Sequence, residues 1–298
     1  MKILITGATG FIGRNLIPKI CGSRYKLAAL VRNADKTRNV FGGNLKLIPF
    51  RKNNLRYKEE IKAFGPEIVL HLASYLTSGF DTRTVRKILD SNIEFGTLVL
   101  DALTGTDVKY FINTGSFSEY AGGPKNLDSA YLYSATKTAF RSILGFYKKI
   151  IGFKVITVTP YTIYGPGDTR KKAMDYIIQS LKSPLPITMS PGKQVLDFIH
   201  IDDLVDFYQK LIGKIRLLKD NSEYHLGTGT GASLKQVALL AEAIAGRPAN
   251  IAWGVKPYRK GDIMHAVADI TKAQRDLGWK PKITLKQGML KLLKDGKR

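Results

Sequence analysis

The chain has 298 residues, a hydrophobic content of 44% and a formal net charge of +23 at pH 7. This length allows one large domain and a smaller one, and no apolar run approaches the roughly 18 residues of a membrane span, which argues against a membrane protein. The charge indicates an anionic partner. Because the basic residues are scattered and are not interleaved with aromatic residues, we expect an anionic small-molecule ligand and neither a nucleic acid nor a membrane partner.

The cysteine content and the start of the chain bear on its location. The only cysteine, Cys21, excludes an internal disulfide, and the first predicted strand leaves no room for a signal peptide. These features favour the cytoplasm. Short basic clusters occur at residues 148–149, 170–172 and 294–298.

The first thirteen residues predict a strand, a tight turn and the start of a helix. Residues 2–6 form a short β-forming run, and three glycines follow at a spacing of three. Glycine lets such a turn curl tightly, lets the backbone approach a pyrophosphate, and lets the helix lie against the strand. The helix N-terminus offers unpaired amides and partial positive charge to phosphates. The predicted cofactor contacts of this turn are Gly7, Thr9, Gly10, Phe11, Ile12 and Gly13.

Residues 26–31 predict the second strand, which ends in Arg32 and Asn33. A carboxylate about 20 residues beyond the glycines would bind the adenosine ribose of NAD, whereas an arginine suits the 2′-phosphate of NADP. We therefore expect NADP as the cofactor, with NAD as the alternative. Arg32 and Asn33 are the predicted contacts, and Lys36 and Arg38 are additional candidates.

Four further strands are predicted at residues 45–50, 68–73, 110–114 and 153–159, with helices at 90–103 and 131–149. This alternation predicts a doubly wound parallel α/β sheet of the Rossmann type, which binds its ligands at the carboxyl ends of the strands. His71 lies inside an apolar run, and we expect a core histidine. The remaining predicted cofactor contacts are Asn54, Leu55, Leu72, Ala73, Ser74, Asn92, Thr114, Tyr133, Lys137, Pro160 and Ile163.

The regular alternation stops at about residue 166. We expect helices at residues 173–181, 234–245 and 285–293, a strand and turn at 224–231, and a strand at 197–201 that Asp202 and Asp203 cap ahead of another helix. This pattern predicts a smaller, discontinuous C-terminal substrate domain. We assign residues 1–165 and about 195–230 to the dinucleotide-binding domain, and about 166–194 and 231–298 to the substrate domain.

Three residues form a predicted catalytic group. Tyr133 and Lys137 lie four residues apart in a predicted helix, so both side chains emerge on one face. A neighbouring ammonium stabilises a phenolate, and so we expect Lys137 to lower the phenol pKa from its usual value of about 10. Ser116 follows the fifth strand, where a hydroxyl can bind the substrate oxygen together with the phenol. No metal site is expected.

Taken together, these motifs resemble those of the extended short-chain dehydrogenases/reductases, the group of sugar-nucleotide epimerases, dehydratases and reductases. The resemblance covers nearly the whole chain and includes residues 71–74, 91–93, 96–97, 164–167, 197–203, 259–262 and 277–281. It implies that Ser116, Tyr133 and Lys137 are catalytic and that the second domain binds a nucleoside diphosphate sugar. It also implies a homodimer, formed through the helices at 90–103 and 131–149. The expected substrate contacts are Thr77, Ser78, Ser116, Phe117, Ser118, Tyr161, Thr162, Lys193 and Arg259.

Departures from the group narrow the expected activity. Phe117 and Ser118 stand where the 4,6-dehydratases have the Asp-Glu pair that eliminates water. Ser118 also stands where the fucose-synthase type has a cysteine that epimerises neighbouring carbons. These departures therefore argue against both the elimination of water and this epimerisation. Leu196 replaces an arginine that contacts the diphosphate, which leaves more of this contact to Arg259 and Lys193.

Of the activities found in this group, hydride transfer without elimination or epimerisation of neighbouring carbons remains. The pattern is most similar to 4-keto-6-deoxy sugar nucleotide reductases of the CDP-paratose and CDP-abequose synthase type, with further likeness at residues 263–265 and 268–270. This implies NADPH-dependent reduction of the C4 keto group of a CDP-linked 4-keto-6-deoxy or 3,6-dideoxy hexose, as in deoxysugar biosynthesis for the O-antigen of lipopolysaccharide. One alternative is a redox-neutral, NAD-dependent 4-epimerase. The other, suggested by the charge, is an RNA-binding protein on a dehydrogenase scaffold.

Overall fold

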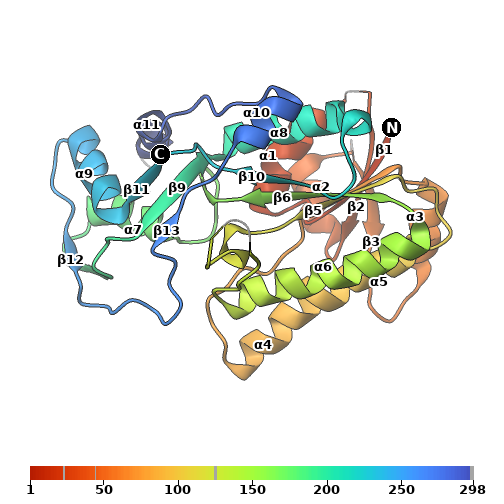
Figure 1. Cartoon of the computed structure of the whole chain (residues 1–298), viewed down its shortest axis with the longest axis horizontal. Helices are drawn as coiled ribbons and strands as arrows, with labels where there is room; N and C mark the ends of the chain where they lie inside the picture. The colour runs from red at the N-terminus through yellow and green to blue at the C-terminus, as the bar shows by residue number, and fades with distance from the viewer. Residues whose placement is uncertain (23, 44, 124–125, 296–298) are drawn as a thin grey trace.

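The computed structural model describes residues 1–22, 24–43, 45–123 and 126–295 (Figure 1). Residues 296–298, which belong to the last basic cluster and to the end of the predicted second domain, lie outside this description. Among the described residues, no helix has the length and apolar content needed to cross a membrane.

A seven-stranded sheet with the order β10-β6-β5-β4-β1-β2-β3 forms the larger part of the protein. Every neighbouring pair in it is parallel. The order 3-2-1-4-5-6 is that of the doubly wound dinucleotide-binding fold, and β10 extends it by one strand. The predicted fold class is confirmed. The strands are β1 (Lys2–Thr6), β2 (Lys26–Val31), β3 (Lys46–Pro49), β4 (Ile68–His71), β5 (Tyr110–Thr114), β6 (Lys154–Pro160) and β10 (Ser222–Leu226).

Helices cover both faces of this sheet (Figure 1), and so its strands are continuous apolar runs. In β1, Ile3 and Ile5 pack into the core on one face and Leu4 packs into the core on the other; all three are fully buried. The helices on the Ile3 face are α1 (Phe11–Ile20), α2 (Ala34–Phe41), α8 (Ile201–Gly213) and α10 (Thr271–Leu277). Those on the Leu4 face are α3 (Arg56–Phe64), α5 (Phe95–Ala102) and α6 (Leu132–Ile151).

The helix predicted at residues 90–103 begins earlier and is not uniform. The helical stretch starts with α4 (Thr82–Leu89), passes through a π-helical turn at Asp90–Glu94, and continues as α5. Asp81 caps α4 by accepting a hydrogen bond from the Thr84 amide at 3.0 Å. The predicted helix at 131–149 corresponds to α6.

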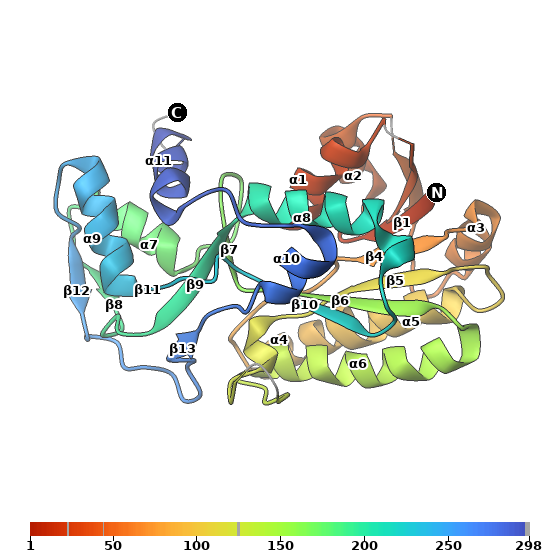
Figure 2. The same ribbon diagram turned by 45° about the horizontal axis from the view of Figure 1, so that its top comes forward.

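The smaller part of the protein is built around β9 (Val195–His200), beside the large sheet (Figure 2). The strand β9 pairs with β7 (Thr162–Tyr164), β11 (Gly231–Ser233) and β13 (His265–Ala266), and β8 (Ile187–Met189) pairs with β12 (Ile251–Trp253). The helices around its core are α7 (Ala173–Ser180), α9 (Leu234–Ala245) and α11 (Leu285–Asp295). The strand β9 contributes Ile199 to the larger core and Phe198 to the smaller one, whereas α8 and β10 contribute to the larger core. The predicted domain boundaries remain predictions.

Two expectations about individual residues have clear outcomes. His71 is 1% exposed and lies 2.9 Å from the Thr6 hydroxyl, and burial lowers its pKa to about 3. The core histidine is confirmed. The expected cap of α8 by Asp202 and Asp203 is wrong, because α8 begins at Ile201 and both carboxylates lie in its first turn. There the helix dipole favours them, and Asp203 also accepts hydrogen bonds from two amides of the segment before α11.

Candidate active site

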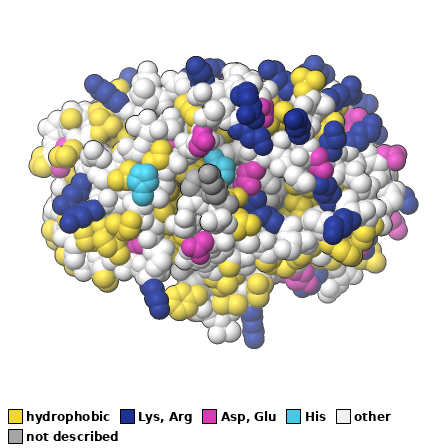
Figure 3. Space-filling model, in the orientation of Figure 1, with side chains coloured by type: hydrophobic (Ala, Val, Ile, Leu, Met, Phe, Trp, Pro, Cys, Tyr) yellow, Lys and Arg dark blue, Asp and Glu magenta, His cyan; other side chains and the backbone are white. Residues whose placement is uncertain are grey.

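A cleft of about 2050 Å³ runs past the carboxyl ends of the large sheet and into the smaller part of the protein. Pockets for a single small ligand usually have volumes of about 300–1,000 Å³, so this cleft has room for two ligands side by side. Its wall combines the glycine-rich turn, the loops after β4 and β5, the start of α6, and segments around β7 and β8. Lys and Arg side chains are spread over the visible face of the molecule and do not form one stripe (Figure 3).

The glycine-rich turn gives the cleft an open helix N-terminus. Gly7 has a φ of +71°, and a Cβ there would lie 2.6 Å from the Ala73 amide nitrogen. A Cβ on Gly13 would overlap the carbonyl oxygen of Ala8. No side chain caps α1 at Gly10, and its first turn holds no acidic residue. The free amides and the helix dipole therefore face the cleft without competition, which fits the pyrophosphate of a dinucleotide.

Beyond the turn, Arg32 and Asn33 line the cleft as expected, together with Lys36. Asn33 caps α2 by accepting a hydrogen bond from the Lys36 amide at 2.8 Å. Arg38 pairs with Asp35 at 2.9 Å and is not part of the wall. This end of the cleft thus presents a guanidinium and an ammonium group, which suits a phosphate.

Four predicted contacts are not part of the cleft wall: Asn54, Leu55, Asn92 and Lys193. A turn closed between Arg51 and Asn54 presents residues 51–53 to the cleft instead, and Leu55 is 58% exposed. The amide of Lys193 donates to the Tyr258 hydroxyl at 3.0 Å. The sequence pattern located this turn but not which of its residues face inward.

Asn92 is buried behind the wall, where it shapes the site. Its side-chain oxygen accepts a hydrogen bond from the Tyr75 amide at 2.7 Å, and its side-chain nitrogen donates to the Thr136 hydroxyl at 3.0 Å. Asn92 therefore connects the loop after β4 to Thr136 of α6, the residue that directly precedes Lys137. It is a supporting residue and not a direct contact of the cleft.

The predicted trio meets at the wall of the cleft. Ser116, Tyr133 and Lys137 are all buried, with exposures of 8%, 8% and 4%, and all three line the cleft. Tyr133 and Lys137 share one face of α6. The Lys137 ammonium donates to the Thr114 carbonyl oxygen at 3.0 Å, and burial lowers the Lys137 pKa to about 8.

The direction of the Tyr133 pKa differs from the sequence-based expectation. Burial is the largest cause and raises the pKa, and interactions of the phenol with the hydroxyls of Ser74 and Ser116 lower it in part. The net shift of the Tyr133 pKa is therefore upward, opposite to the expected direction. The phenol stays protonated at neutral pH.

The loop after β5 holds residues that the sequence analysis missed. Residues Phe117–Glu119 form a short 3-10 helix after Ser116, whose Oγ lies 2.8 Å from the Oγ of Ser118. The Glu119 side chain is fully buried and pairs with Arg141 at 2.7 Å. Arg141 follows Tyr133 and Lys137 at the same spacing of four, and this repeat on one helix face is the pattern that would have pointed to it.

The other side of the cleft is aromatic and basic. The rings of Phe117 and Tyr161 stack with centroids 5.4 Å apart, and the other expected substrate contacts Thr77, Ser78, Ser118, Thr162 and Arg259 also line the cleft. This wall also carries a basic group that was not among the predicted contacts. Its members are Arg14, Arg170, Lys171, Lys172 and Lys256.

Among the described residues, no group of three or more His, Cys, Asp or Glu side chains could hold a metal ion. The predicted cofactor contacts Gly7, Thr9, Gly10, Phe11, Ile12, Gly13, Leu72, Ala73, Ser74, Thr114, Pro160 and Ile163 all line the cleft. The arrangement as a whole offers an anion-binding turn, a protonated phenol and a serine hydroxyl in one continuous space.

Comparison with known proteins gives a consistent result. Residues 3–227 match the NAD dependent epimerase/dehydratase family. The CDP-abequose synthase of Salmonella typhimurium is 29% identical, over 98% of this chain and 97% of that protein. The UDP-glucose 4-epimerase of Pisum sativum is 25% identical, over 94% of this chain and 91% of that protein.

Solved structures share the fold. The UDP-glucuronic acid 4-epimerase from Bacillus cereus, in complex with UDP-glucuronic acid and NAD, superposes with a TM-score of 0.86 at 21% identity and covers both chains fully. The UDP-glucose 4-epimerase of Thermotoga maritima with UDP-glucose gives a TM-score of 0.84 at 23% identity, over 100% of this chain and 99% of that one.

Proposed function

Because this chain belongs to the NAD dependent epimerase/dehydratase family, it is an NAD(P)-dependent enzyme that modifies sugar nucleotides, and we propose that its reaction is the reduction of a keto group. The proposed substrate is a nucleoside diphosphate 4-keto-6-deoxy or 3,6-dideoxy hexose, CDP-linked, and the proposed reductant is NADPH. The CDP-abequose synthases, at 25–29% identity, support this choice of sugar nucleotide.

One observation carries the proposal: the Ser116 hydroxyl of the loop after β5 lies near the protonated Tyr133 phenol of α6, and this loop offers no free carboxylate. Burial raises the Tyr133 pKa, and Ser116 is within reach of the phenol. The only carboxylate of the loop at residues 115–120 belongs to Glu119, which is fully buried in an ion pair with Arg141. A loop that offers no free carboxylate beside the serine and the phenol suits addition of hydride and a proton better than elimination of water.

The residues of this chain would then act as follows. The bound nicotinamide cofactor supplies the hydride that adds to the C4 carbonyl carbon. Tyr133 gives its proton to the carbonyl oxygen as negative charge develops there, and the Ser116 hydroxyl donates a hydrogen bond to the same oxygen. Lys137, held by the Thr114 carbonyl oxygen, places a positive charge beside the phenolate that remains.

The cofactor preference rests on the end of β2. The residues fit a dinucleotide, because the glycine turn leaves no space for a Cβ at Gly7 and leaves the N-terminus of α1 uncapped. Arg32 and Lys36 line the cleft where a carboxylate would favour NAD. This supports NADP.

An NAD-dependent 4-epimerase is the alternative, and it is favoured by relatives such as the Pisum sativum UDP-glucose 4-epimerase. It would use the same trio without net consumption of the cofactor. The RNA-binding alternative loses support because Lys and Arg side chains are spread over the visible face of the molecule (Figure 3) and a basic group lines the cleft.

We also propose a homodimer formed through α5 and α6. Phe146 and Ile150 are 58% and 56% exposed, and their spacing of four residues places both on one face of α6. Pairing of these helices with those of a second copy would bury both side chains.

The test is incubation with CDP-, dTDP-, GDP- and UDP-linked 4-keto sugars while the absorbance of NADPH is followed. We expect oxidation of NADPH in stoichiometric amounts with a CDP-linked 4-keto sugar. Interconversion of sugar nucleotides at C4 without oxidation of NADPH would establish the epimerase instead.

A further inference from the structure

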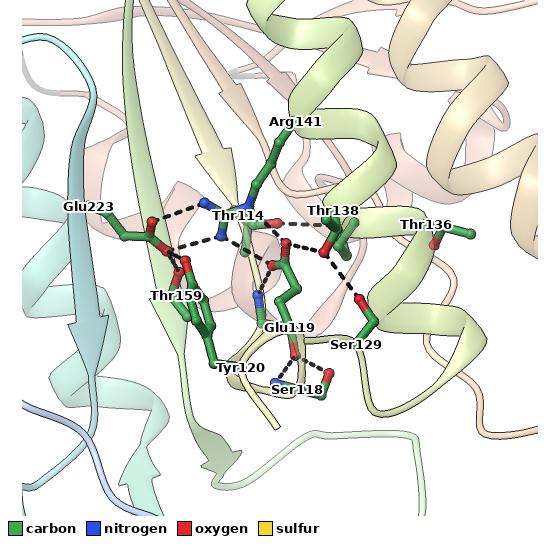
Figure 4. Close-up of polar contacts among 12 residues, drawn as sticks. Thr114, Ser118, Glu119, Tyr120, Ser129, Thr136, Thr138, Arg141, Thr159 and Glu223 are labelled. Carbon is green, nitrogen blue, oxygen red and sulfur yellow. Dashed lines mark hydrogen bonds and ion pairs between the residues drawn. The ribbon is translucent and has the colours of Figure 1, made fainter. Parts of the chain in front are cut away.

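Glu119 is a buried carboxylate next to the proposed catalytic loop, and the mechanism above does not use it. Its side chain has no exposed surface, and an unpaired charge in such a place would be very costly. Arg141 donates to it from Nε at 2.7 Å and from Nη2 at 3.2 Å, and the Thr138 hydroxyl donates at 3.3 Å. Figure 4 shows these contacts between the loop and α6.

Arg141 is shared with a second carboxylate, Glu223 of β10. Its Nη1 and Nη2 atoms each lie 2.9 Å from an oxygen of Glu223, which also accepts hydrogen bonds from Tyr120 at 2.7 Å and Thr159 at 2.5 Å (Figure 4). Two carboxylates and one guanidinium leave the group with one excess negative charge. Replacing buried ion pairs by apolar side chains of similar volume is often neutral or stabilising, so this arrangement is weak evidence for a role in stability.

The ion cluster of Glu119, Arg141 and Glu223 contacts the backbone of Ser116 through Glu119. The Glu119 Oε1 atom accepts a hydrogen bond from the Ser116 amide at 2.8 Å. A Cβ on Gly115 would lie 2.8 Å from both Glu119 Oε1 and Arg141 Nη2, so this glycine allows the loop backbone to rest on the ion pair. Glu119 is not part of the cleft wall and cannot touch a substrate there.

The ion pair also connects to α6, which carries Tyr133 and Lys137, the other two members of the proposed catalytic group. Arg141 follows Lys137 by four residues and Tyr133 by eight, and residues four apart on a helix share one face. The carboxylate of Glu119 thus links the backbone of Ser116 to the helix face that carries Tyr133. It fixes the separation between two groups that come from different elements of the fold.

We propose that Glu119 is a positioning residue, which holds the Ser116 backbone against α6 so that the Ser116 hydroxyl and the Tyr133 phenol point at one carbonyl oxygen. The inference rests on the proposed function, because it takes these two groups as the partners of that oxygen. A displacement of about 1 Å in such a group lowers the rate about 100-fold. The expected effect of losing Glu119 is therefore on kcat and not on substrate binding.

A double-mutant cycle tests this. Glu119→Gln removes the negative charge and replaces Oε2 by an amide nitrogen, which cannot accept the hydrogen bond from Arg141 Nε. We expect it to lower kcat about 10-fold to 100-fold and to leave the KM for the sugar nucleotide within about 3-fold. In a Ser116→Ala background the same change should alter kcat less than about 3-fold, because it acts through Ser116. Equal losses of kcat in both backgrounds would overturn the proposal.

The matched control is Glu223→Gln, which removes a carboxylate from the same Arg141 without touching Ser116. We expect its kcat to stay within about 3-fold of the wild-type value even where its melting temperature falls as far as that of Glu119→Gln. If Glu223→Gln lost as much kcat as Glu119→Gln, the effect would come from the ion cluster as a whole and not from the contact with Ser116, and the proposal would be refuted. Glu119→Asp, which keeps the charge but shortens the side chain, replaces Glu119→Gln if the latter does not fold.

A measurement without turnover separates this inference from the proposed function. In ¹⁵N-labelled protein, the Ser116 amide proton should resonate far downfield because a carboxylate accepts its hydrogen bond. It should move upfield in Glu119→Gln and stay in place in Glu223→Gln. An unmoved Ser116 resonance in Glu119→Gln refutes the positioning role, whereas a wild-type protein that turns over no sugar nucleotide refutes only the proposed function.

Discussion

The Tyr133→Phe substitution tests the proposed chemistry most directly. It removes one oxygen atom from a side chain that is 8% exposed and leaves the ring in place. The phenol pKa is raised by burial, so essentially every molecule carries the proton at neutral pH, and the substitution removes a fully populated acid. The hydroxyl of Ser116 remains, but it cannot replace the proton donor.

The expected loss follows from the role of a general acid. Such a group contributes about 10²-fold to 10⁴-fold to a rate, which corresponds to about 3–5 kcal/mol of activation free energy. Because the glycine turn, Arg32 and Lys137 are unchanged, the Kd of NADPH should stay within about 3-fold. The free energy of unfolding should change by about 1 kcal/mol, since one buried hydroxyl loses its partners.

The assay compares initial rates of NADPH oxidation with NADPH binding measured by fluorescence. Tyr224→Phe is the matched control, because Tyr224 is 1% exposed and its hydroxyl donates to Asp276 at 3.1 Å, outside the cleft wall. We expect this control to keep its rate. If Tyr133→Phe turns over substrate within about 3-fold of the wild-type rate, the phenol is not the proton donor.

Three further predictions concern the cofactor, the fold and the assembly. Arg32→Asp should lower kcat/KM with NADPH about 10-fold to 100-fold and raise the relative use of NADH, as measured with both cofactors, because it replaces the proposed phosphate contact by a carboxylate; an unchanged preference contradicts the assignment. The folded-state pKa of His71 is depressed to about 3 from 6.5, so its stabilising contribution is complete above pH 6.5 and about 3 kcal/mol of it is lost by pH 4. Urea unfolding should show this loss in the wild type and less of it in His71→Gln. Phe146→Glu combined with Ile150→Glu should yield monomers in light scattering, because charges oppose burial of this face; an intact dimer would place the interface elsewhere.

Burial of the Tyr133 phenol explains why its pKa is raised and not lowered as expected, since burial disfavours the charged phenolate. The Lys137 ammonium is held by the Thr114 carbonyl oxygen at 3.0 Å, and burial lowers its own pKa to about 8. For a reduction a protonated phenol is favourable, because the acid must carry its proton when the carbonyl oxygen gains charge.

Much of the fold and of the site could be predicted from local patterns. The glycine spacing after residue 6 identifies the turn because only glycine fits where a Cβ would meet the Ala73 backbone. The spacing of Tyr133 and Lys137 places both on one face of α6, whatever surrounds the helix. Ser116 was found because parallel strands bring their carboxyl ends to one edge.

Other parts depended on contacts between distant segments. In the turn at residues 51–54, residues 51–53 line the cleft and Asn54 does not. The direction of the chain after β3 decides which of these residues face inward, and the composition of the turn does not predict it. The basic residues at 170–172 were visible as charge, but their place on the wall depends on how the chain turns after β7.

The sequence by itself determined the parallel α/β sheet, the dinucleotide-type turn and the spacing of the proposed catalytic side chains, because each of these follows from backbone geometry over a few residues. The tertiary structure decided the direction of the Tyr133 pKa and the meeting of Glu119, Arg141 and Glu223, which are 22 and 82 positions apart along the chain. Burial and long-range pairing arise only when the elements pack together, and they determine which groups carry a proton and which only hold others in place.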